Sequence, residues 1–140
     1  MITAKELRWH ISIILADHIG DYTWNGNGNS KAIAILPDNK HGFNYPPPGT
    51  TVTGIEAVII RPIPAVKMLL NKQYIGRATW EIYLKQWDRN SNLIDATEEL
   101  IVGLSRLDYA FESPVRVPPN ERMNGIESVR TAVYEYLINQ

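Results

Sequence analysis

Few residues in this sequence have the types and spacing that catalysis or metal binding requires. The histidines are His10, His18 and His41, and the lack of cysteine excludes disulfides, thiolate metal sites and a cysteine nucleophile. His10 and His18 lie about two turns apart on one predicted helix, too far to share a metal ion. Asp17, His18 and Asp21 form one compact cluster without the paired spacing of zinc motifs. We therefore expect no catalytic residue, no metal site and no cofactor.

A glycine-rich stretch at residues 25–31 invites comparison with a phosphate-binding loop. Such a loop opens a long helix, but here Lys31 leads into an apolar run at 32–36 that has the pattern of a strand. The stretch therefore predicts a turn. No serine lies in a Gly-x-Ser-x-Gly motif, and the adjacent Glu98 and Glu99 fall on the polar side of a predicted helix. Hydrolase chemistry has no support in these residues.

Composition narrows the class of protein. The 140 residues carry 14 Lys and Arg against 15 Asp and Glu, a net charge of −1. This length suits one domain, so we expect residues 1–140 to form a single unit. The charge balance argues against a dedicated nucleic-acid-binding protein. No window approaches the roughly 18 apolar residues that a membrane-spanning helix needs, so we expect no membrane partner.

Two segments have the periodicity of amphipathic helices. The first covers about residues 4–18, where apolar residues recur at helical spacing after a capping box formed by Thr3 and Glu6. The second runs from about 93 to 107, with Asn92 as its N-cap and leucines along one face. Each helix therefore has one apolar stripe to bury against a sheet.

Strand patterns fill most of the remaining sequence. Strands are predicted at residues 21–24, 32–36, 51–61, 74–87 and 109–117. Residues 65–72 fit an edge strand or a helical turn. Residues 127–138 fit a strand or a helix, and their β-branched side chains favour a strand. Prolines at 37–50 predict a long, stiff loop. The order of elements predicts an α+β fold, with two helices packed on one face of a mostly antiparallel β-sheet in a single domain.

Aromatic side chains outside the predicted core are candidates for protein contacts, because Tyr and Trp are enriched at interfaces. In the alternating segment 74–87, Trp80 falls on the apolar face and should lie in the core. Tyr83 and Trp87 fall on the polar face. The interface candidates are Trp24, Phe43, Tyr45, Tyr83 and Trp87. Cover by a second layer of the same chain, or a loop that packs on itself, would explain them as well.

Several short strings resemble a known protein family. They are Pro-Pro-Gly at 47–49, Gly-Ile-Glu at 54–56 and residues 79–88, and they lie between an N-terminal amphipathic helix and a final strand. In outline the resemblance covers nearly the whole chain. The sequence is similar to the small α+β tail-terminator and neck proteins, which take part in head–tail joining in tailed bacteriophages.

The resemblance implies a virion structural protein, not an enzyme. Tail terminators form hexameric rings that cap the tail tube, stop its polymerisation and face the neck, and a ring needs contacts that close on themselves. The implied partners are further copies of the chain, the tail tube and neck or connector proteins, while DNA passes through the lumen without specific binding. The implied location is the tail–neck junction of the virion, after assembly in the host cytoplasm.

Three basic residues on or beside the predicted sheet are candidates for lining such a lumen: Arg61, Arg77 and Lys85. A solvated sheet face would explain them equally. Two other functions stay open. One is a head–tail connector or tail-completion adaptor. The other, from a different class, is a small enzyme or ligand-binding domain with a pocket between the first helix and the sheet. An enzyme should place convergent polar groups at strand ends, whereas an assembly protein should carry long loops and exposed aromatic residues.

Overall fold

The computed structural model describes residues 1–23, 28–36, 51–62, 65–68, 74–89, 91–120 and 125–139, with the backbone alone at 65–68, 74–75 and 137–139. The elements in chain order are α1 (Ala4–Ile14), β1 (Asp21–Thr23), β2 (Asn29–Lys31), β3 (Ile33–Leu36), β4 (Thr51–Val52), β5 (Ile55–Ile60), β6 (Ala65–Met68), β7 (Tyr74–Gln86), α2 (Leu93–Arg106), β8 (Ala110–Val117) and β9 (Ser128–Asn139).

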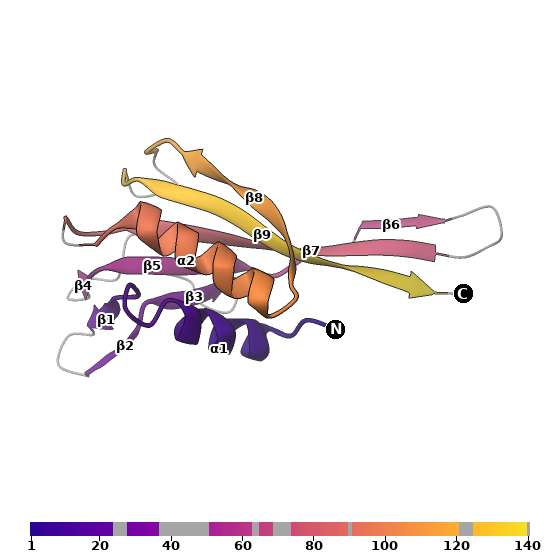
Figure 1. Ribbon diagram of the computed structural model, residues 1–140, viewed down its shortest axis with the longest axis horizontal. Coiled ribbons are helices and arrows are strands. Elements are labelled where there is room, and N and C mark those ends of the chain that lie inside the picture. Colours follow the sequence, from indigo (N-terminus) through magenta and orange to yellow (C-terminus); the bar gives the residue numbers. More distant parts are fainter. Residues whose placement is uncertain are drawn as a thin grey trace.

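The strands form two sheets, and both helices cover one face of the larger sheet (Figure 1). The larger sheet has the order β3-β5-β7-β9-β8, and β6 also pairs with β7. Its pairings are antiparallel apart from the parallel pair of β3 with β5. The smaller sheet has the order β2-β1-β4. The chain is therefore an α+β protein, as its sequence predicts.

Side chains cap both helices at their N-termini. The Thr3 hydroxyl accepts a hydrogen bond from the Glu6 amide at 3.2 Å, and the Asn92 side chain accepts one from the Asp95 amide at 3.1 Å. α1 ends at Ile14, four residues before the predicted end. The following turn is tighter, with i to i−3 bonds such as that from the His18 amide to the Leu15 carbonyl at 2.9 Å.

The main core lies between the helices and the larger sheet. Alternation along β7 directs Trp80, Ile82 and Leu84 toward the helices, and all three are buried. The helices contribute residues of their apolar stripes, among them Leu7 and Leu104. Trp80 is 5% exposed, so its predicted place in the core is confirmed. Within the described residues, neither helix is long and apolar enough to cross a membrane.

The predicted strand at 51–61 is two strands in different sheets. The break falls at Gly54, whose φ of +67° is a backbone conformation that glycine adopts without strain. Gly54 also crosses Gly20 closely, since a Cβ on Gly20 would lie 1.6 Å from the Thr53 carbonyl oxygen. The β-branched composition of this run gave no sign of the break, which allows β4 to join the smaller sheet and β5 the larger one.

Two ambiguous segments are strands. Within residues 65–72, the described part forms β6 along the edge of β7, and all but the first of residues 127–138 lie in β9. β8 has an irregular register between Glu112 and Val115, on either side of Pro114. The predicted loop at 37–50 lies outside the described residues.

At one end, the larger sheet extends past the helices as an arm (Figure 1). The arm consists of Ala65–Met68 of β6, Tyr74–Arg77 of β7 and Tyr136–Asn139 of β9. The edge of β9 that faces away from β7 pairs with β8, and this pairing ends at the pair of Tyr134 with Ala110. Beyond this point no described strand pairs with that edge, so the arm has β6 at one side and a free edge of β9 at the other.

Candidate interaction surfaces

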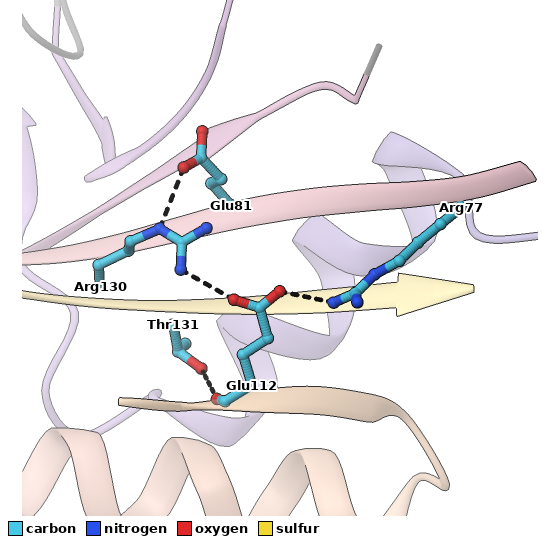
Figure 2. A network of polar contacts seen from close by, with 5 residues as sticks. All are labelled: Arg77, Glu81, Glu112, Arg130 and Thr131. Atoms are coloured by element: carbon cyan, nitrogen blue, oxygen red, sulfur yellow. Dashed lines mark hydrogen bonds and ion pairs between the residues drawn. The ribbon is translucent and has the colours of Figure 1, made fainter. Parts of the chain in front are cut away.

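The sheet face that carries no helix holds a network of four charged side chains from three strands (Figure 2). Arg130 of β9 donates from Nε to Glu81 Oε1 at 3.0 Å and from Nη1 to Glu112 Oε1 at 2.9 Å. Arg77 of β7 donates from Nη2 to the other Glu112 oxygen at 2.6 Å. The Thr131 hydroxyl donates to the Glu112 carbonyl at 2.6 Å, beside the irregular part of β8. The ion pairs join β7, β8 and β9 across this face without helices, which is the outer face of the sheet.

This network balances its own charge. It contains two guanidinium groups and two carboxylates. Burial alone would lower the pKa of Arg130, but its hydrogen bonds to Glu112 and Glu81 outweigh that effect and raise the pKa above its usual value. The Arg77 guanidinium also lies over the Tyr134 ring, 3.9 Å from the centroid. The Arg77 side chain is therefore partly exposed, as a lumen residue would be, but its charge is compensated by the Glu112 carboxylate.

A second polar cluster surrounds Glu56 of β5, which is 1% exposed. Its carboxylate accepts hydrogen bonds from the Tyr22 hydroxyl and from the Trp87 indole, the latter at 2.9 Å, and lies 3.4 Å from Lys85 Nζ. Burial, opposed by the attraction of Glu56, lowers the pKa of Lys85. Burial and then Glu56 raise the pKa of Tyr22 above its usual range. The cluster fastens β1 of the smaller sheet to the larger sheet.

This cluster corrects part of the sequence analysis. Lys85 is 0% exposed, so its ammonium faces Glu56 and cannot face a lumen. Tyr83 is 7% exposed and packs with Val58. Its aromatic ring is therefore covered by the same chain, which is the alternative to an interface role given above. Trp87 is partly buried, and its indole N–H is used by Glu56. Alternation along residues 74–87 predicts the correct face for these residues, but it does not reveal that other parts of the chain cover that face here.

The remaining candidates are differently placed. Trp24, Phe43 and Tyr45 lie outside the described residues. Arg61 follows β5 and is exposed, and its amide donates to the Leu36 carbonyl at 3.0 Å. Its place in a lumen stays a prediction.

The helical layer exposes apolar side chains that the sequence analysis did not single out. Trp9 and Ile13 of α1 are 60% and 54% exposed. Val102 of α2 and the adjoining Leu107 are 47% and 45% exposed. A groove of about 590 Å³ lies between the two helices, and Ile13, Val102 and Leu107 are part of its wall. The sequence signal for this exposed apolar surface is the four-residue spacing of Trp9 and Ile13, which places both on one side of the helix, away from the buried stripe.

Two histidines join α1 and its following turn to the region of α2. His10 Nδ1 lies 2.7 Å from the Tyr109 hydroxyl, and His18 Nε2 lies 3.0 Å from a Glu99 oxygen. Between these contacts the helices meet at Gly103, where a Cβ would lie 2.6 Å from the Ile14 side chain. Among the described residues, no group of three or more His, Asp or Glu could hold a metal ion.

The free edge of β9 presents backbone groups in a defined order. The Gln86 amide donates to the Glu127 carbonyl at 3.1 Å, and the register of β7 with β9 makes these two residues direct partners. Because hydrogen-bonded pairs alternate along antiparallel strands, Leu137 directs its N–H and C=O at β7. Tyr136 and Ile138 direct theirs away from β7, toward the free edge. The Tyr136 side chain is 60% exposed.

Comparison with known proteins gives no further guide to this surface. A scan against models of protein families and a search of curated proteins found no match to the chain.

Proposed function

We propose that this chain is a virion structural protein of a tailed bacteriophage: a tail terminator that forms a ring on the tail tube and joins it to the neck. One observation carries the proposal beyond the resemblance of the sequence. The arm has a strand edge at each of its two opposite sides, that of β6 and that of β9 from Tyr136 onward. Edges placed in this way suit contacts between successive copies of one chain.

The contact joins the β9 edge of one copy to the β6 edge of the next, so that the sheet continues between subunits. It is a heterologous contact, and repeating it produces a ring when the rotation between copies closes. The lengths match, since β6 has four residues and the free part of β9 runs from Tyr136 to Asn139. Backbone N–H and C=O groups supply the hydrogen bonds.

The edges of the larger sheet differ in how far they resist pairing. The edge strand β8 carries Pro114 and an irregular register, both of which interrupt a backbone ladder. Residues 135–139 of β9 contain neither proline nor lysine and pair regularly with β7. A regular strand edge without such protection is a hazard for aggregation unless a partner covers it. This contrast favours β9 over β8 as the edge that a neighbour occupies.

The outer sheet face suits a surface past which DNA moves. The arginines of the network, Arg77 and Arg130, are paired with carboxylates, so they offer little net charge to a phosphate backbone. This agrees with passage of DNA without specific binding.

The proposal is tested by deleting the gene from a tailed phage that carries it and examining the particles by electron microscopy. We expect tails of excess and variable length that lack heads, because nothing stops polymerisation of the tube. A plasmid copy of the wild-type gene should restore normal tails. Deletion particles with tails of normal length would overturn the terminator role.

A matched pair of variants tests the contact itself. Tyr136→Pro removes one outward N–H and leaves the bonds of Leu137 to β7 in place, so it should fold but fail to restore normal tails. Tyr136→Thr removes the aromatic side chain but keeps the backbone N–H, so this variant should restore normal tails. Circular dichroism of both purified variants checks folding. Restoration by folded Tyr136→Pro would contradict pairing at this edge.

A further inference from the structure

The outward side of α2 has a symmetric pattern of charge. Glu98, Val102 and Arg106 are spaced four residues apart, and all three line the groove between the helices. Val102 at the centre is 47% exposed. Glu98 and Arg106 make no ion pair with another described residue. They are about 12 Å apart along the helix, too far to pair with each other.

This spacing is self-complementary. Glu98 and Arg106 lie about 6 Å along the axis on either side of Val102. If two α2 helices pack antiparallel about a two-fold axis at Val102, Glu98 of each copy comes opposite Arg106 of the other. A two-fold contact uses the same patch on both copies, so one residue pattern supplies both ion pairs.

We propose that a second copy of this chain docks on the helical layer through this two-fold contact. Val102 packs against Val102 of the other copy, and Ile13 and Leu107 add apolar area on the walls of the groove. The ion pairs of Glu98 with Arg106 fix the antiparallel direction. This contact is separate from the strand edges of the arm, because the helices cover a face of the sheet and stop short of the arm (Figure 1).

Sedimentation velocity of the purified chain tests the contact, with Tyr136→Pro in every sample so that strand pairing is blocked. We expect a species of twice the 15.9 kDa chain mass at concentrations between about 1 and 100 μM. Val102→Asp should leave only monomer. If the chain with Tyr136→Pro alone is monomeric throughout this range, the proposed contact is overturned.

Charge reversal tests the geometry. Glu98→Arg places two like charges opposite each other at each end of the contact, and Arg106→Glu does the same with the opposite sign. Each should weaken the dimer by about tenfold or more. The double variant, and an equimolar mixture of the two single variants, should recover the wild-type affinity. Failure of both to recover it, with helix content unchanged by circular dichroism, would contradict this pairing. These results do not depend on the tail phenotype, so each proposal can fail alone.

Discussion

Glu56 accepts hydrogen bonds from Tyr22 and Trp87 and forms an ion pair with Lys85. Within the part of the chain that the structure describes, the buried charged side chains, Glu56 and Lys85, therefore lie together. Removing one member of a buried ion pair leaves an uncompensated charge, which typically costs about 3–5 kcal/mol. The sequence showed Lys85 and Trp87 on the polar face of a strand. It could not show that the hydroxyl of Tyr22, more than thirty positions away in the sequence, donates a hydrogen bond to Glu56.

The alkaline stability of the protein should depend on Tyr22. Burial and then Glu56 raise its pKa above the ordinary value of 10.0, so the phenol stays neutral in the folded chain and ionises in the unfolded one. The unfolded state then binds fewer protons, and the stabilisation, fully present below about pH 10, is lost as the pH rises further, by about 1.4 kcal/mol per pH unit.

Urea unfolding between pH 8 and 11 measures this effect. Tyr22→Phe should be less stable than wild type at pH 8, because it lacks the bond to Glu56, but its stability should fall less steeply above pH 10. Below pH 9 the two slopes should agree. Equal slopes above pH 10 would show that the phenol is not held neutral by folding.

At the scale of elements, local signals predicted those features that depend on neighbouring residues. The caps Thr3 and Asn92 mark the helix starts, and the period of two in β7 identifies Trp80 as a core residue. Features that depend on contacts between segments distant in the sequence were not predicted. The break at Gly54 arises from its crossing with Gly20, and no property of the β-branched run around it reveals that contact.

The glycine crossing makes a sharp prediction. Gly20→Ala places a methyl group against the backbone of Thr53, which cannot rotate away, and should cost about 3 kcal/mol or more. Gly28→Ala is the control. Its φ of +84° disfavours alanine, but the space around it is open, so the cost should be about 1 kcal/mol. Thermal unfolding of both variants gives the comparison. Equal losses would contradict a close crossing at Gly20.

At the scale of the whole molecule, the described residues offer three surfaces with different chemistry. The arm has backbone edges, the outer sheet face has balanced charge, and the helical layer has an apolar groove with Glu98 and Arg106 on its walls. The arm could not be predicted from the sequence, because it depends on how far β9 runs beyond β8. That is a matter of register, which the alternation of a single strand does not specify.

The location of the protein in a virion tests the central claim most directly. Tailed particles should be labelled with an antibody against this chain and imaged by electron microscopy. Label is expected at the head-proximal end of the tail, where the tube meets the neck. Particles that carry no label, or label confined to another part of the virion, would contradict it.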